Sequence, residues 1–238
     1  KGYAARFEYD YSRKYLAEIN LGYNGSENFA PGHQYGFFPA FSGGYVITEE
    51  SFMDPLKSVV SFLKVRASIG LVGNDKIGGS RFLWQGMYNQ VAGVNPNLQF
   101  FGFGTTNPSS LGGIYESRSE NLLLTWETAT KRNIGADIRF FSNNLLDVTL
   151  DFFNEDRRDI LMQARSLLNT TGISSPQYNI GEVRNWGYEI EVVHRNKIDE
   201  VGYALKANYS FARNVIKNYD DPMGTPAYQK YEGYRINQ

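Results

Sequence analysis

The stretch Trp126–Asn154 decides the fold of this chain, and it reads WETATKRNIGADIRFFSNNLLDVTLDFFN. Apolar or small residues take every second position on both sides of a short polar segment, Ser142–Asn144. A period of two around a tight turn predicts a β-hairpin with one apolar face. The alternating positions are Ile134, Ala136, Ile138 and Phe140 on the first arm, and Leu146, Val148, Leu150 and Phe152 on the second.

The rest of the chain repeats this unit. With the two arms of the hairpin it has about eight predicted strands, the others being 3–11, 15–23, 37–47, 63–71, 186–192 and 203–211. A helical turn is expected at 49–53, and Pro39 weakens the strand around it because proline has no N–H for the ladder. Loops are expected at 24–35, at 73–125 (with room for short strands of its own), at 157–183 and from Arg213 onward.

The connections between the predicted strands alternate between tighter and generally longer segments. An up-and-down antiparallel sheet gives this pattern, because all odd connections lie at one end and all even connections at the other. We call these ends the short-turn rim and the long-loop rim. The fold class predicted from the sequence is all-β.

The distribution of charge indicates what surrounds the sheet. The apolar positions of the predicted strands carry no charged residue, although 21% of the chain is charged. Charges on the interleaved positions would be costly in a dry core and suit a water-filled lumen. Aromatic residues of the apolar face gather near both strand ends, as bilayer interfaces favour: Tyr9, Tyr11, Tyr15, Tyr45 and Tyr203 near the short-turn rim, and Tyr3, Tyr23, Phe37, Trp186 and Phe211 near the long-loop rim.

The sequence therefore predicts an antiparallel, up-and-down transmembrane β-barrel. Two alternatives remain at this stage. Alternation also fits a soluble β-barrel or sandwich that acts as a binding module, since such a protein has one apolar face turned inward. A small, complete eight-stranded outer-membrane barrel with a structural or adhesion role has the same pattern.

Composition excludes several other classes of protein. The chain has 238 residues, a net charge of −1 and no cysteine, so it offers no electrostatic case for nucleic acid and no disulfide framework. His33 and His194 are too few and too far apart to indicate a metal site, and no cofactor is expected. No catalytic residues are expected either: Glu155, Asp156 and Asp159 lie among arginines and are interpreted as a solvated charge cluster.

Several segments resemble the SusC/RagA-like TonB-dependent outer-membrane transporters. Each is short, but their order and spacing extend across nearly the whole chain. The matching segments are GYAARFEYDY (2–11), FAPGHQYGFFP (29–39), VRASIG (65–70), GND (73–75), WET (126–128), NIGAD (133–137), DFF (151–153), DIL (159–161) and NIGEVRNWGYE (179–189).

This resemblance implies a barrel of about 22 strands with an N-terminal plug, of which residues 1–238 are a partial barrel domain without the plug or the final strands. It also implies residence in the bacterial outer membrane, in contact with its lipid. Such transporters import oligosaccharides or peptides, driven through TonB by segments outside this chain, under a SusD-like surface lipoprotein that acts as a lid.

Two groups of residues are candidates for contact with a glycan or peptide substrate. Aromatic rings of the 73–125 loop can stack on sugars or hold peptide side chains, or they can pack the loop against itself or against the lid; these are Trp84, Tyr88, Phe100, Phe101, Phe103 and Tyr115. Charged residues of the interleaved positions are expected to line the lumen, where they tune passage or pair across strands; these are Arg66, Asp137, Arg139, Asp147, Glu189 and Glu191.

Overall fold

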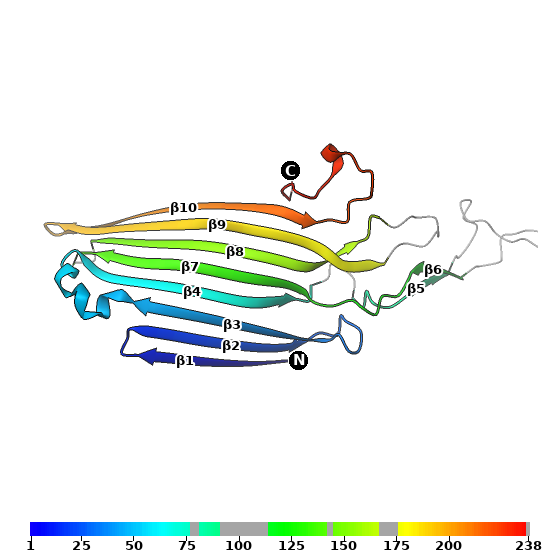
Figure 1. Cartoon of the computed structure of the whole chain (residues 1–238), viewed down its shortest axis with the longest axis horizontal. Coiled ribbons are helices and arrows are strands. Elements are labelled where there is room, and N and C mark those ends of the chain that lie inside the picture. Colours follow the sequence, from blue (N-terminus) through cyan, green and yellow to red (C-terminus); the bar gives the residue numbers. More distant parts are fainter. Residues whose placement is uncertain (77–80, 91–113, 142–144, 167–175, 237–238) are drawn as a thin grey trace, which may run out of the picture.

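The computed structural model describes residues 1–76, 81–90, 114–141, 145–166 and 176–236, and one antiparallel sheet dominates it (Figure 1). This sheet has eight strands in the order β1-β2-β3-β4-β7-β8-β9-β10, and β5 and β6 form a separate two-stranded sheet. The strands are β1 Gly2–Tyr11, β2 Tyr15–Gly25, β3 Tyr35–Val46, β4 Val60–Asn74, β5 Met87–Gln90, β6 Ile114–Arg118, β7 Glu127–Phe140, β8 Leu146–Gln163, β9 Gln177–Ile198 and β10 Val201–Asn218.

The order of the strands confirms the up-and-down antiparallel prediction. Each strand of the main sheet pairs with the next one along the chain, and only the excursion through β5 and β6 interrupts this order. β1 and β10 form the two edges and do not pair with each other in the described part of the chain. The sheet is an open section of a barrel, so the alternative of a closed eight-stranded barrel is wrong.

Three strands extend by six or more residues into segments expected to be loops, and β4 (Val60–Asn74) also reaches into 73–125. β8 continues to Gln163 and β9 begins at Gln177, so both ends of the loop expected at 157–183 are strand. β10 continues to Asn218, although the chain was expected to be loop from Arg213 onward. These extensions all lie at the long-loop rim.

A backbone irregularity and a change of surroundings explain why the extensions were missed. The β8–β9 register shifts between Arg157 and Ile160, where Asp159 has a φ of 58°. A bulge of this kind inserts a residue and breaks the period of two. Charged residues also occupy outward positions of these extensions, such as Arg158, Arg184 and Arg213, so no apolar face marks them in the sequence.

The smaller elements agree with the sequence. Two short 3₁₀ helices, η1 (Ile47–Glu49) and η2 (Ser51–Leu56), confirm the helical turn expected at 49–53, and a third, η5 (Ala227–Gln229), follows β10. β5 and β6 confirm short strands within 73–125. The turn expected at Ser142–Asn144 lies outside the described residues.

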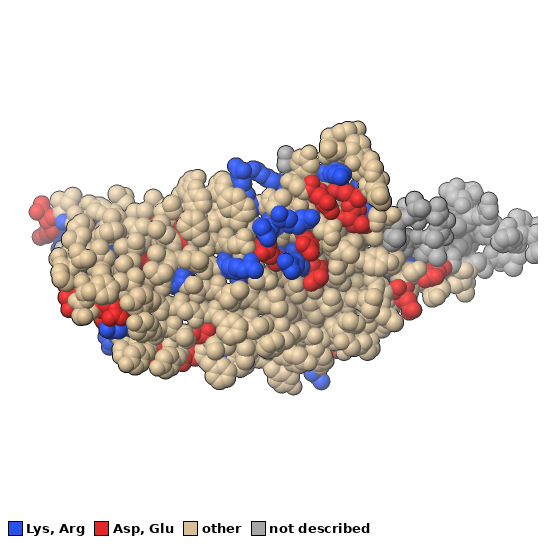
Figure 2. Space-filling model, in the orientation of Figure 1, with Lys and Arg blue, Asp and Glu red and all other residues tan. Residues whose placement is uncertain are grey.

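The two faces of the sheet differ in chemistry. Large apolar side chains of one face are exposed, among them Tyr3 at 72%, Ile134 at 62% and Phe152 at 63%. Figure 2 shows this face as largely uncharged, apart from the ends and one patch over β7–β10. Hollows of 560 and 330 Å³ lie on the opposite face, and their lining includes Arg6, Glu8, Glu18, Lys64, Arg66, Asp137, Arg139, Asp147, Glu191 and Arg195.

The register explains how the aromatic residues form two belts. Following the paired residues across the sheet gives one outward-facing row with an aromatic at each end: Tyr9, Ala17, Gly43, Ala67, Ile134, Phe152, Tyr188 and Phe211. Strands of membrane barrels tilt by about 35–45°. A row perpendicular to tilted strands therefore climbs from one membrane interface to the other. Tyr9 lies in the belt near the short-turn rim, the lower belt, and Phe211 lies in the belt near the long-loop rim, the upper belt.

An arginine that replaces Leu150, on the apolar face of β8, is expected to destabilise the folded barrel by about 2–4 kcal/mol, because a charge near the bilayer midplane loses hydration. The matched control is Thr149→Arg, one residue away on the other face, where Asp137 and Glu191 are its cross-strand neighbours. The measurement is reversible unfolding of the full-length protein in lipid vesicles. Equal destabilisation by both substitutions would contradict the assignment of the faces.

Candidate functional site

Arg66 is the centre of the charged face. Its guanidinium donates to Asp151 Oδ2 at 2.7 Å and to Asp137 Oδ2 at 3.3 Å, and it reaches Asn133 Oδ1 at 3.5 Å. These partners come from β7 and β8, so one arginine of β4 links three neighbouring strands. The side chains are about one-fifth to one-third exposed, with Arg66 at 33% and Asp151 at 18%, so the pairing is only partly screened by water.

A glycine makes room for this cluster. Gly135 lies between Arg66 and Asp151 in the register, and its backbone is buried. A Cβ at this position would lie 2.7 Å from Asp151 Oδ1 and 2.8 Å from Arg66 Cζ. Both distances are shorter than van der Waals contact, so a larger residue here would have to displace the Arg66 guanidinium or the Asp151 carboxylate from the cluster.

The other predicted lumen residues lie on the same face, where most of them have cross-strand partners. Arg195 pairs with Asp147, and Lys206 pairs with Glu191 at 2.8 Å. The guanidinium of Arg139 lies over the ring of Phe62 at 4.8 Å, and Glu189 is exposed. Sequence reasoning had not singled out Asp151 or Arg195, although both occupy charged positions of alternating strands.

Two of the three carboxylates considered for catalysis are paired with cations, and the third, Asp159, accepts from the hydroxyl of Thr128 at 3.1 Å. Glu155 pairs with Arg157 at 2.9 Å and with Lys131 at 3.5 Å, while Asp156 pairs with Arg132 and Arg184. Glu155 and Asp156 are adjacent in a strand, so their side chains point to opposite faces of the sheet. Two such carboxylates cannot flank one substrate bond.

Buried residues of the long-loop rim form a small hydrophobic cluster. Phe29 and Leu124 are fully buried there with Leu83 and Trp126, and the Trp126 indole N–H donates to the carbonyl of Gln34 at 3.2 Å. This cluster anchors the β2–β3 loop and the residues before β7 to the sheet. Phe29 and Trp126 belong to the FAPGHQYGFFP and WET segments that carry the family resemblance.

A second resemblance segment is tied to the same place. Asn179, at the start of NIGEVRNWGYE, accepts from the backbone N–H of Thr125 at 3.0 Å and donates to the carbonyls of Thr125 at 2.9 Å and Asp159 at 2.8 Å. The resemblance segments that are far apart in sequence thus meet at the long-loop rim, where they hold loops to strands.

The predicted aromatic residues of the 73–125 loop are in different environments. Trp84 is half-buried and packs against the cluster around Phe29, whereas Tyr88 on β5 is 68% exposed. Tyr115 lies on β6, opposite Asn89 of β5. Phe100, Phe101 and Phe103 lie outside the described residues. The structure thus brings Tyr88 and Tyr115 onto one small sheet, and it places Trp84 in the packing of the rim.

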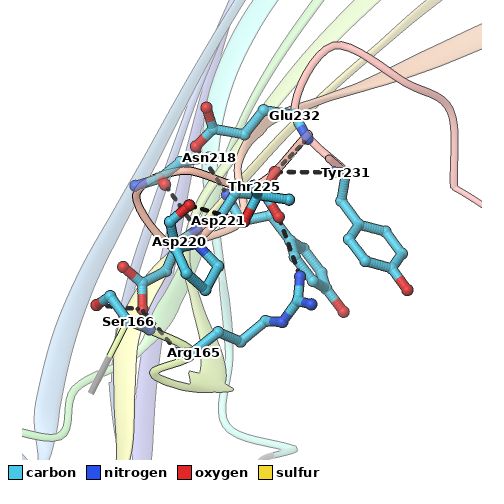
Figure 3. A network of polar contacts seen from close by, with 10 residues as sticks. Arg165, Ser166, Asn218, Asp220, Asp221, Thr225, Tyr231 and Glu232 are labelled. Atoms are coloured by element: carbon cyan, nitrogen blue, oxygen red, sulfur yellow. Dashed lines mark hydrogen bonds and ion pairs between the residues drawn. The ribbon is translucent and has the colours of Figure 1, made fainter. Parts of the chain in front are cut away.

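The segment after β10 is clamped to the end of β8 (Figure 3). Asp221 pairs with Arg165 at 3.0 Å and accepts from the backbone N–H groups of Tyr231 and Glu232 at 2.8 and 3.0 Å. The Arg165 guanidinium also lies 5.3 and 4.9 Å from the ring centroids of Tyr219 and Tyr231. The ion pair and the cation–π contacts together hold the segment after β10 against the end of β8.

The neighbouring aspartate strengthens the clamp. Asp220 accepts from the backbone N–H and the hydroxyl of Ser166, at 3.0 and 2.9 Å. These bonds from Ser166, followed by one from the backbone of Arg165, lower the pKa of Asp220 below that of an ordinary aspartate. The carboxylate, and with it this part of the clamp, therefore stays charged at neutral and mildly acidic pH.

The clamped segment covers a cavity of 660 Å³ on the charged face of the sheet, at the long-loop rim. Apolar residues and charged residues line it together, including Ile160, Ile216, Tyr219, Tyr231, Arg157, Glu182 and Arg235. A cavity of this size and mixed lining suits a flexible ligand with both polar and apolar groups.

Comparison with known proteins identifies the family of this barrel section. The model of the TonB dependent receptor-like β-barrel matches residues 3–238. The chain belongs to this family.

Two relatives and one structure illustrate the match. TonB-dependent receptor P39 of Formosa agariphila is 30% identical over 92% of this chain and 20% of the relative. TonB-dependent receptor SusC of Bacteroides thetaiotaomicron is 28% identical over 80% of this chain and 18% of the relative. A structure of the RagAB peptide transporter superposes on this chain with a TM-score of 0.78 and 19% sequence identity. The match covers 98% of this chain and 24% of the RagAB chain, and it shows a similarity of fold.

The chain spans about a fifth of the length of the curated relatives it matches. The resemblance to SusC/RagA-like transporters and the transmembrane barrel fold predicted from the sequence are both confirmed. The soluble binding module is therefore wrong as an alternative.

Substituting Gly135 by alanine is expected to destabilise the full-length barrel by about 1–3 kcal/mol, because the new methyl group overlaps Arg66 and Asp151. Gly43→Ala is the matched control, since its Cβ would have only the Leu16 carbonyl oxygen at 3.8 Å. Unfolding in lipid vesicles measures both. If Gly135→Ala is as stable as Gly43→Ala, the cluster around Arg66 does not depend on this glycine.

Proposed function

We propose that this chain is part of the wall of a TonB-dependent outer-membrane importer that takes up oligosaccharides or peptides. The observation that carries the proposal is the family match over residues 3–238, on a sheet with one exposed apolar face and one charged face. The apolar face meets the lipid of the bacterial outer membrane. The charged face lines a water-filled lumen through which a hydrophilic substrate passes.

The orientation of the wall follows from its rims. Membrane barrels of this class have short turns on the periplasmic side and longer loops on the outside. The rim with the turns after β1 and β9 then faces the periplasm, and the rim with β5, β6 and the clamped segment faces outward. Substrate first meets the long-loop rim, its 660 Å³ cavity and Tyr88.

The lumen face suits the passage of polar substrates. Its charges occur mostly as cross-strand pairs, such as Arg66 with Asp137 and Asp151 or Lys206 with Glu191. Paired charges offer both donors and acceptors along the wall without holding a substrate of either sign tightly, and conduction requires such weak binding. The wall acts as a passage and not as an enzyme, and its energy comes from TonB through other parts of the protein.

A SusD-like surface lipoprotein is the proposed partner at the outer rim. Large apolar side chains are exposed there, among them Ile114 and Leu123 at 75% and Tyr88 at 68%. Exposed apolar groups in a rim of polar residues are typical of protein–protein contact sites. A lipoprotein lid would cover them and close the mouth of the barrel over the substrate.

Uptake by intact cells tests this function. Cells that produce the full-length protein with its lipoprotein partner are given fluorescent oligosaccharides or oligopeptides, and the internal label is measured. We expect uptake of one of the two classes and its loss when TonB is deleted, because import against a gradient needs energy coupling. Uptake of neither class, or equal uptake without TonB, would contradict the proposal.

A further inference from the structure

A patch of arginines interrupts the otherwise apolar outer face near the long-loop rim (Figure 2). It consists of Arg132 on β7, Arg184 on β9 and Arg213 on β10, around Asp156 on β8. We call these residues the outer arginine patch. The import function assigns them no role, since they lie on the face opposite to the lumen.

The register places the patch directly beyond the upper aromatic belt. Arg132 and Arg213 share a row with Trp186, one step beyond the row that ends in Phe152, Tyr188 and Phe211. Asp156 and Arg184 pair with each other in the following row. Each patch residue lies two or four residues along its own strand beyond the last large apolar residue of the outer face, which is Ile134, Phe152, Trp186 or Phe211, and this is about 7 or about 13 Å further on. That is the level of lipid headgroups, because aromatic belts mark the edge of the hydrocarbon.

The contacts within the patch leave positive charge unbalanced. The Asp156 carboxylate accepts from Arg184 at 2.6 Å and from Arg132 at 2.8 Å, and its side chain is only 13% exposed. The side chains of Arg184 and Arg132 remain 44% and 49% exposed. Arg213 lies over the ring of Phe211 at 5.2 Å and has a ring, not a carboxylate, as its neighbour.

The next row does not cancel this charge. It adds Arg158, which is exposed, and Asp159, whose carboxylate accepts from the hydroxyl of Thr128 at 3.1 Å. Cations therefore outnumber carboxylates across the whole patch. Asp156 on β8 pairs with one arginine from the strand on each side, Arg132 and Arg184, and the exposed part of each guanidinium can meet an anion from the membrane.

We propose that the outer arginine patch binds the phosphate of an anionic lipid headgroup in the outer leaflet. Arginine is suited to this because its planar fork of N–H donors matches phosphate oxygens. The aromatic belt beneath, with Phe152, Tyr188 and Phe211, lies against the acyl chains of the same lipid. The inference rests on the proposed outer-membrane orientation and adds a specific lipid site to it.

Native mass spectrometry of the full-length protein in detergent tests the site. The probes are lipid A with one phosphate and the same lipid without it. The test variant is Arg132→Gln/Arg184→Gln/Arg213→Gln, and the matched control is Arg13→Gln/Lys57→Gln/Lys197→Gln, which removes the same charge from exposed positions at the short-turn rim. Asp156→Asn is a further variant, which breaks the pairing but keeps all three arginines.

We expect the wild type, the control and Asp156→Asn to bind the phosphorylated lipid equally well. The test variant should bind it about tenfold more weakly, which corresponds to a loss of about 1.4 kcal/mol of binding free energy. The shift of the folded band on heating checks that every variant is folded. Equal binding by the test variant, equal binding of both lipids by the wild type, or loss of binding in Asp156→Asn would overturn the inference. Fractionation and the uptake assay on the same cells separate this inference from the proposed function: wild type that is absent from the outer membrane, or that takes up neither substrate class, speaks against the proposed function, whereas loss of lipid binding with uptake intact speaks against the lipid site alone.

Discussion

The continuous hydrogen-bonded register from β1 to β10 is the constraint on which the other features depend. Within a bilayer the backbone has no water to bond with, so each strand must satisfy its polar groups on its neighbours. Antiparallel pairing then sends successive side chains to opposite faces, and a slip of one residue would exchange the faces. The aliphatic band, the aromatic belts and the charged wall are each a consequence of this one register.

The two sets of charges on β7 and β8 follow the same rule. Arg66 binds Asp137 and Asp151 on the charged face, and Gly135 leaves the space for it. On the other face Asp156 holds Arg132 and Arg184, but only beyond the aromatic belt, where a charge no longer meets hydrocarbon. Whether a residue occupies an odd or an even position of its strand decides which face its charge is on. Its distance along the strand from the hydrocarbon decides whether a charge on the outer face is stable.

The sequence was sufficient to predict the strands that cross the apolar band, because lipid on one side and water on the other impose a period of two. It was insufficient beyond that band. The ends of β8, β9 and β10 carry charged residues on the face that is apolar elsewhere, and the bulge at Asp159 shifts the register. The charged wall could be predicted from parity, whereas the choice of partners could not, since pairing Arg66 with Asp151 requires knowing that β4, β7 and β8 are neighbours. The rim cluster of Phe29, Leu124 and Trp126 joins distant segments and has no local signal.

The central claim is that successive residues of one strand alternate between lipid and water, and cysteine scanning of β8 tests it most directly. This chain has no cysteine, so once any cysteine elsewhere in the full-length protein has been replaced, a spin label placed singly at each position from 147 to 152 reports only on that position. In the full-length protein in vesicles, oxygen, which concentrates in lipid, should accelerate the spin relaxation of labels at Val148, Leu150 and Phe152. A water-soluble nickel complex should accelerate the spin relaxation of labels at Asp147, Thr149 and Asp151. A profile without this alternation, or one with the two sets exchanged, would contradict the account.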